Sequence, residues 1–147
     1  MPENCRKKLL FARACRLALG ARAKRPGALC LVFVTNPQIR RINRKFLKHD
    51  YNTDVIAFPY TDDPIPRRQT PSAPSSPSQS RPFGDIFVSV DQARIQARGL
   101  GRSLLEELLT LAAHGALHLV GYDDHSASER RRMFARQDRI VQRILKI

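Results

Sequence analysis

The 147-residue sequence lacks tryptophan, has only three cysteines, and contains half as many acidic as basic residues. Cys5, Cys15 and Cys30 are odd in number and never form a Cys-x-x-Cys pair, so neither a disulfide framework nor a thiolate zinc site is indicated. No apolar run approaches the ~18 residues that cross a bilayer. The first residues do not resemble an export signal either. We therefore expect a soluble protein that stays in the cytoplasm and does not insert into a membrane.

The shortage of acidic residues leaves a net charge of +13, and this charge is unevenly distributed. Residues 1–60 hold 13 basic and 3 acidic side chains, whereas the rest of the chain holds 13 and 10. Such a surface attracts polyanions, and RNA, DNA and an anionic membrane surface are all candidates on charge alone. A basic surface without a specific ligand is the competing explanation. The charge therefore indicates a class of partner without identifying it.

The apolar pattern predicts one domain, residues 1–147, in which helices pack against a small mixed sheet. A chain of this length with 42% hydrophobic residues can build a single core. Short runs rich in β-branched and aromatic residues predict strands at 28–35, 54–59 and 84–89. Helical spacing predicts a basic amphipathic helix at 5–22 and a helix at 90–98 that ends at Gly99. A further helix is predicted to have Asn36 as its N-cap and Pro37 as its first helical residue. The resulting fold class is α+β.

Two further helices have clear start signals. Ser103 and Glu106 form a capping box that opens a helix to about Leu119, and Ser126 with Glu129 opens the last helix. The first of these helices is apolar almost all round, so we expect it to be the central buried helix. The inward stripe of the last helix is predicted to be Met133, Phe134, Ile140, Val141, Ile144 and Leu145.

The segment at about 61–82 differs in composition from the rest of the chain. It contains six of the ten prolines together with five serines. The predicted strands on either side are too short to build separate cores. The composition therefore predicts a disordered surface insertion within one domain.

Three of the four histidines lie within twelve residues, in the segment His114-Gly-Ala-Leu-His118-Leu-Val-Gly-Tyr-Asp-Asp-His125. Residues four apart on a helix share a face, so the imidazoles of His114 and His118 can bind one metal ion. Gly121 then allows the chain to turn back and bring His125 as a third ligand. Structural histidines with ordinary hydrogen bonds are the alternative, but three imidazoles around a helix-ending glycine favour zinc with an open fourth position.

The spacing of the first two histidines is that of zinc proteases, whose His-Glu-x-x-His motif supplies a glutamate as general base. Here that position is Gly115, which argues against peptide hydrolysis. Zinc also lowers the pKa of a bound water towards ~7 and polarises phosphoryl oxygens. Beside a basic surface, a zincin-like metal helix of this kind favours cleavage of phosphodiester bonds, with no catalytic group predicted beyond that water.

Three segments resemble, in order, the YbeY family of bacterial metal-dependent endoribonucleases. The histidine segment resembles the family signature, and Asn43 with residues 50–59 resembles its Asn…Asp-x-Pro-Thr-Asp-Val-Leu-Ser-Phe-Pro block. Residues 83–86 resemble its Leu-Gly-Asp-Ile block. The likeness extends from about Leu29 to the C-terminus, apart from the insertion. It implies a zinc-dependent endoribonuclease, selective for single strands, that acts in maturation of the 16S rRNA 3′ end and in ribosome quality control.

The resemblance implies that one zinc ion is held by His114, His118 and His125, without a small-molecule cofactor, and that the partner is ribosomal RNA or the small ribosomal subunit. The family usually has Gly-Tyr-Asp-His, so the extra aspartate makes Asp124 the alternative third ligand. Leu47 stands where many members carry an arginine implicated in cleavage. This departure keeps open a second interpretation, a ribosome-associated RNA-binding assembly factor with a mainly structural metal and weak or no cleavage. The chain also begins at its first helix, which implies either a smaller sheet than the family's or a start further upstream.

Basic and aromatic residues near the matched segments are the candidate RNA contacts. The candidates for phosphate binding are Arg41, Arg44, Lys45 and Lys48, with a solvated helix face as the alternative explanation. Tyr51, Phe58 and Tyr122 are candidate stacking partners for bases, and of these Phe58 is expected in the core instead. Asp85 is expected either to orient a ligand histidine or to cap a turn.

Overall fold

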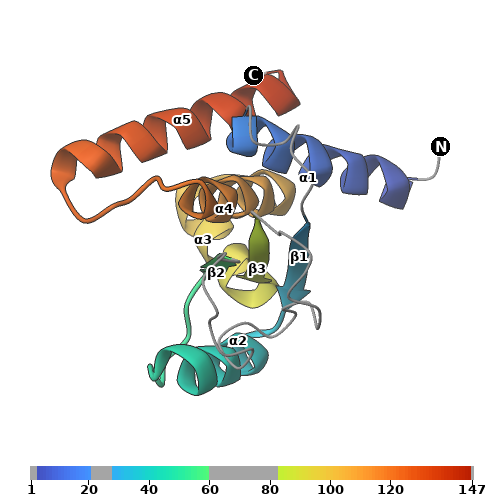
Figure 1. Cartoon of the computed structure of the whole chain (residues 1–147). Coiled ribbons are helices and arrows are strands. Elements are labelled where there is room, and N and C mark those ends of the chain that lie inside the picture. Colours follow the sequence, from blue (N-terminus) through green and yellow to red (C-terminus); the bar gives the residue numbers. More distant parts are fainter. Residues whose placement is uncertain (1–2, 21–27, 60–82, 147) are drawn as a thin grey trace.

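The computed structural model describes residues 3–20, 28–59 and 83–146 (Figure 1). The elements in chain order are α1 (Glu3–Leu19), β1 (Leu29–Val34), α2 (Asn36–Ile42), the π-helical turn η2 (Asn43–Leu47), β2 (Val55–Pro59), β3 (Gly84–Ser89), α3 (Val90–Leu100), α4 (Leu104–Leu119) and α5 (Ala127–Leu145). The insertion expected at 61–82 lies outside the described residues. Among the described helices, none has the length and apolar character needed to cross a membrane.

The described strands form one mixed sheet in the order β1-β3-β2. The central strand, β3, runs parallel to β1 and antiparallel to β2, and every one of its residues is buried. A Cβ atom on Gly84, the first residue of β3, would overlap the carbonyl oxygen of Phe58 and lie 3.0 Å from Cδ2 of Leu119. Glycine therefore allows β2 and the end of α4 to approach this point closely. The predicted α+β class with a small mixed sheet is confirmed.

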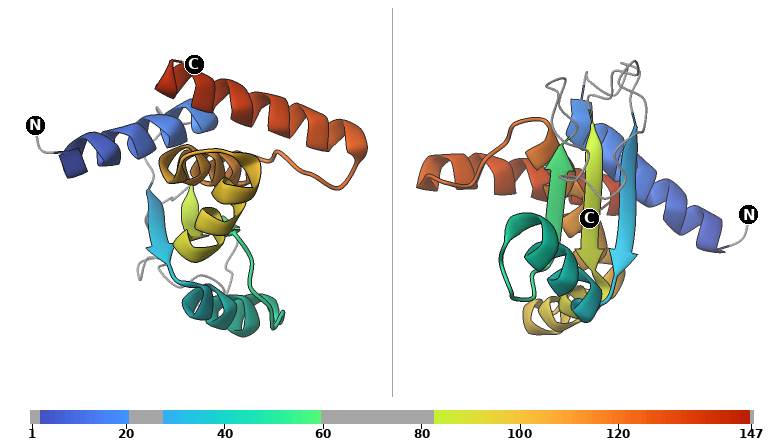
Figure 2. Two further views of the ribbon diagram at one scale, coloured as in Figure 1. Left: turned by 180° about the vertical axis from the view of Figure 1, so that it is seen from behind. Right: turned by 60° about the horizontal axis from the view of Figure 1, so that its bottom comes forward.

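Helices cover both faces of the sheet. Ile86 and Val88 of β3 belong to the apolar cluster that includes α1, α4 and α5, whereas Phe87 packs with Ile39 of α2 on the other face. Figure 1 shows α4 between the sheet and an outer layer made by α1 and α5, and Figure 2 shows the same arrangement from behind and from below. The position of α4 as the central helix is confirmed, and α2 lies in a separate layer across the sheet.

Side-chain caps set the starts of the predicted helices. The hydroxyl of Ser103 accepts a hydrogen bond from the Glu106 backbone N–H, and that of Ser126 accepts one from Glu129, as the sequence predicted. The start predicted for α2 was one residue late, because the N-cap is Thr35, which forms a reciprocal capping box with Gln38. The strand before it therefore ends at Val34, not at Thr35.

Two other predicted features were wrong. The third helix does not end at Gly99: it continues to Leu100, and Gly101 adopts the left-handed conformation, with φ of 66°, that ends a helix. Phe134 was expected in the buried stripe of α5 but is 41% exposed. Its ring instead stacks on the imidazole of His114, with the centroids 6.0 Å apart and the planes at 26°.

Candidate metal centre

Close packing of α4 on the sheet sets the position of its two histidines. Gly115 follows His114 and is buried, and a Cβ atom at this residue would lie 2.7 Å from Cγ2 of Ile86 and 3.3 Å from Cγ2 of Val55. Because real Cβ contacts are longer than this, only glycine allows the observed approach of α4 to β3. Gly115 stands where zinc proteases carry their catalytic glutamate, and here it serves the packing of α4 against the sheet.

The imidazoles of His114 and His118 face each other. Their Nε2 atoms are 3.1 Å apart, and their ring centroids are 4.7 Å apart. The Nδ1 atom of His114 lies 2.8 Å from Oε1 of Gln137, and that of His118 lies 3.1 Å from the carbonyl oxygen of Tyr122. Because both oxygens accept hydrogen bonds, each neutral imidazole carries its proton on Nδ1.

This choice of tautomer directs the lone pairs of both Nε2 atoms into the same space. Neither atom then has a proton to donate to the other, so a cation between the rings would relieve the repulsion of the two lone pairs. Two nitrogens that bind one tetrahedral zinc at 2.0–2.1 Å are ~3.4 Å apart, which is close to the observed separation. The geometry of these side chains therefore fits a shared metal ion.

Gln137 is a site residue that the sequence analysis missed. It lies on α5, is only 6% exposed, and holds His114 through the contact with Nδ1. A hydrogen-bond partner on the non-coordinating nitrogen fixes the orientation of a metal-binding histidine. The sequence pattern that could have identified Gln137 is its place in the apolar stripe of α5, four residues after the buried Met133.

The environment of His114 favours its neutral form. Burial lowers the pKa of His114, and the nearby His118 acts in the same direction, whereas the hydrogen bond with Gln137 and the carboxylates of Asp54 and Asp124 raise the pKa. The net effect is a pKa below the ordinary value of 6.5. A neutral imidazole is the form that binds a metal ion.

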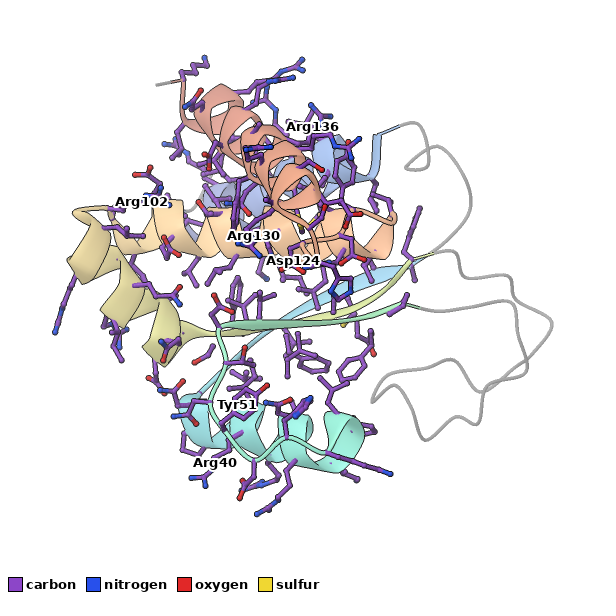
Figure 3. The ribbon with its side chains drawn as sticks, turned by 90° about the vertical axis from the view of Figure 1, so that its left-hand side faces the viewer. Arg40, Tyr51, Arg102, Asp124, Arg130 and Arg136 are labelled. Carbon is purple, nitrogen blue, oxygen red and sulfur yellow. The ribbon has the colours of Figure 1, made fainter. Side chains whose placement is uncertain are left out.

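The structure brings Asp124, not His125, to the two helix histidines. The candidate ligand atoms of His114, His118 and Asp124 all lie within 4.8 Å of one another, and all three residues are half-buried. The side chain of His125 is 85% exposed, and its Nε2 atom lies 3.2 Å from Oδ1 of Asp123. Figure 3 shows Asp124 on the side of the sheet that α4 and α5 cover. The alternative third ligand from the sequence is therefore the one that this arrangement favours.

Asp85 lies across the sheet from the histidines. It is fully buried in β3, where it pairs with Cys30 of β1 and Phe58 of β2. Side chains alternate along a strand, so Asp85 shares the face of Phe87, which packs against α2. This places Asp85 on the face away from the imidazoles. In the described part of the chain, Gln137 makes the histidine contact that was one of the two roles expected of Asp85.

The candidate RNA-binding residues of α2 and η2 also lie in the layer across the sheet from α4. All of them are exposed: Arg41, Arg44, Lys45 and Lys48. Leu47, where the resemblance implies an arginine, is 41% exposed, and Tyr51 is 55% exposed. Figure 3 shows Arg40 and Tyr51 on this layer, opposite Asp124. An RNA strand that contacts both the basic helix and the histidines has to pass around the edge of the sheet.

A cleft of about 540 Å³ adjoins the loop that links His118 to Asp124. It is lined by Val120, Gly121, Tyr122, Asp123, Glu129 and Arg132. Tyr122 is 38% exposed. Its carbonyl oxygen accepts the hydrogen bond from His118, so the same residue contacts a candidate metal ligand with its backbone and borders the cleft. The predicted stacking candidate Tyr122 thus borders a cavity, whereas Phe58, with 5% exposure, is part of the core.

Comparisons with known proteins identify similar sequences and a similar fold. The chain is 42% identical to an endoribonuclease YbeY of Elusimicrobium minutum over 144 residues, which cover 98% of this chain and 93% of the relative. It is 40% identical to an endoribonuclease YbeY of Acholeplasma laidlawii over 118 residues, which cover 80% and 75%. The solution structure of TM1509 from Thermotoga maritima has the same fold, with a TM-score of 0.62 and 20% identity over 99% of this chain and 86% of that one. The family model for endoribonuclease YbeY matches residues 5–145, and the chain therefore belongs to this family of RNA-cleaving enzymes.

Proposed function

We propose that this protein is a cytoplasmic zinc-dependent endoribonuclease that cuts single-stranded ribosomal RNA, in maturation of the 16S rRNA 3′ end and in ribosome quality control. Membership of the YbeY family supports cleavage of RNA. The observation that carries the metal dependence is the pair of Nε2 lone pairs at 3.1 Å between His114 and His118. Single-strand selectivity and the ribosomal substrate rest on the resemblance of the three sequence segments to the family.

The donor set fits one zinc ion per chain. His114 and His118 supply two imidazole nitrogens, and Asp124 supplies a carboxylate oxygen. Two histidines and one carboxylate leave a coordination position open, which is the pattern of catalytic zinc sites. When bound, zinc supplies a Lewis acid that polarises a phosphoryl oxygen and lowers the pKa of water. We assign the third ligand to Asp124, because His125 is directed to Asp123 in the observed loop.

The surrounding residues orient the ligands and the substrate. Gln137 holds the proton of His114 on Nδ1, and the exposed ring of Phe134 covers one face of that imidazole. The basic side chains of α2 and η2 bind phosphates that flank the cleaved bond after the strand passes the sheet edge. A lysine acts there as a point charge and lacks the two parallel donors of an arginine. Binding by this helix is therefore expected to position RNA without adding a bidentate contact to the reacting phosphate.

Removal of the metal tests the proposal directly. The purified protein should cleave a single-stranded rRNA fragment, lose at least ~90% of this activity in a chelator, and regain it when zinc is added, because the open coordination position is lost with the ion. Cleavage is measured on denaturing gels, and the same sequence annealed into a duplex is the control. Undiminished cleavage in the chelator would contradict the proposal.

The same experiment distinguishes the nuclease from the second interpretation, an RNA-binding assembly factor with a mainly structural metal. The exposed Leu47 favours this alternative, because an aliphatic side chain cannot bind the phosphate that the family's arginine is expected to contact. Tight binding of the rRNA fragment without cleavage, together with a lower melting temperature in the chelator, would support it. Replacement of Leu47 by arginine should then create or raise cleavage.

Replacement of Gln137 by leucine is expected to weaken zinc binding 10- to 100-fold. The substitution leaves the Nδ1 atom of His114 without its hydrogen-bond partner, and loss of such a partner typically has an effect of this size. Zinc affinity is measured by competition with a chromophoric chelator. Gln142→Leu is the matched control, because Gln142 is exposed on the same helix. Equal affinity of the two variants would show that the contact does not orient the ligand.

A further inference from the structure

The arginines of α5 are concentrated on one side of the helix. The helix has six arginines and two acidic residues. Those at positions 132, 136, 139 and 143 follow spacings of four, three and four residues, which places them in one stripe, 4.5–6 Å apart along the helix axis by the helical rise of ~1.5 Å per residue. We call Arg132, Arg136, Arg139 and Arg143 the arginine stripe.

Two contacts locate this stripe on the molecule. The Nη2 atom of Arg136 donates a hydrogen bond to the carbonyl oxygen of Leu17 at 3.0 Å, so the stripe lies on the side of α5 that borders the end of α1. Figure 3 shows Arg136 there, while Arg130 lies on another side of the same helix. Arg132, at the start of the stripe, lines the cleft beside Tyr122. The stripe therefore leads along the outer layer from the cleft, which adjoins the loop between His118 and Asp124.

The remaining guanidinium groups of the stripe are available to a ligand. Arg132, Arg139 and Arg143 are exposed, and in the part of the chain that the structure describes none of the three forms an ion pair. By contrast, the cleft itself also contains the carboxylates of Asp123 and Glu129. These repel a phosphate but accept hydrogen bonds from the amino groups of a base, next to the exposed ring of Tyr122.

We infer that the arginine stripe and the cleft form a second RNA-binding surface. A single strand that extends from the metal centre places a base against Tyr122. The phosphates that follow this base lie along Arg132, Arg136, Arg139 and Arg143. This inference rests on the proposed function. It assigns RNA contact to α5, which is far along the chain from the basic α2. The stripe is not evident from the net charge of residues 61–147, because their acidic side chains nearly balance the basic ones. A guanidinium suits this role because it binds phosphate through two parallel donors.

The salt dependence of RNA binding tests the surface. Arg132, Arg139 and Arg143 are replaced together by glutamine, and Arg136 is kept because it holds α1. The matched control replaces the exposed Arg94, Arg98 and Arg131, so both triple variants lose the same charge. Binding of a single-stranded RNA of about 20 nucleotides is measured at 4 °C over a range of salt, with gels to verify that the RNA is intact. Each lost phosphate contact lowers the slope of log K against log[salt] by ~0.7, so the stripe variant should lose ~2 in slope and bind ~100-fold more weakly at 0.1 M salt.

The control triple should retain the native slope, and a stripe variant with lysine at all three positions should retain most of it. Equal losses of slope in the glutamine variant and the control would show a simple effect of net charge and overturn the inference. A native slope in the glutamine variant would also overturn it. Thermal melting of all variants verifies that they fold. Because binding is measured without cleavage, its result is independent of the metal-removal experiment, and either hypothesis can fail alone.

Discussion

Replacement of His114 by alanine is expected to reduce cleavage of single-stranded RNA by at least ~100-fold. The Nε2 atom of this residue lies 3.1 Å from that of His118 and is one of three donors in the candidate centre. Loss of a residue that only orients a metal ligand lowers metal affinity or activity 10- to 100-fold, and loss of the ligand itself should exceed this range. Initial cleavage rates at saturating RNA, with zinc content measured on the same sample, provide the comparison.

The fourth histidine of the chain supplies the control. His49 lies on the loop after η2, is exposed, and is not part of either candidate metal group among the described residues. Its replacement by alanine makes the same chemical change without removing a donor, so zinc content and cleavage should remain at the native level. Native cleavage by the His114 variant would mean that the histidine pair does not take part in the reaction.

Replacement of Gly115 by glutamate is expected to destabilise the protein strongly, although it creates the motif of zinc proteases. The first added atom would lie 2.7 Å from Cγ2 of Ile86, which is fully buried. Overpacking of this kind costs ~1–3 kcal/mol, and burial of an unpaired carboxylate adds several more. We expect a loss of at least ~4 kcal/mol, or a fall of ~10 °C or more in Tm.

The same substitution at Gly99 is the control for intrinsic effects of glutamate in a helix. Gly99 is exposed on α3, and a Cβ atom there meets nothing within 4 Å. Glutamate also has a higher helix propensity than glycine, so the Gly99 variant should be as stable as the native protein or slightly more so. Thermal unfolding followed by circular dichroism compares the two. Similar Tm values for both variants would contradict the packing explanation for Gly115.

Local signals in the sequence predicted most of the elements. The hydroxyls of Ser103 and Ser126 cap the helices they were expected to open, because a cap depends on residues three positions apart. The spacing of His114 and His118 likewise predicted that their imidazoles share a helix face, which their ring contact confirms. Such features depend on the helix alone.

Features that depend on tertiary packing were not predicted. The proximity of Asp124 to the two helix histidines depends on the conformation of the loop after α4, which the helix spacing does not specify. Gln137 reaches His114 only because α5 packs on α4. The arginine stripe was not predicted either, because the net charge of residues 61–147 is small. Only the position of α5 in the fold shows that these arginines share one exposed side of the helix.

The zinc content of two single-residue variants tests the central claim most directly. Asp124→Ala and His125→Ala are purified alongside the native protein, and the zinc bound per chain is measured by elemental mass spectrometry. The native protein should carry about one zinc ion, His125→Ala should retain it, and Asp124→Ala should lose most of it. Among the described residues, Asp124 is the one that has a ligand atom within 4.8 Å of both helix histidines. Loss of zinc from the His125 variant with retention in the Asp124 variant would contradict the assignment.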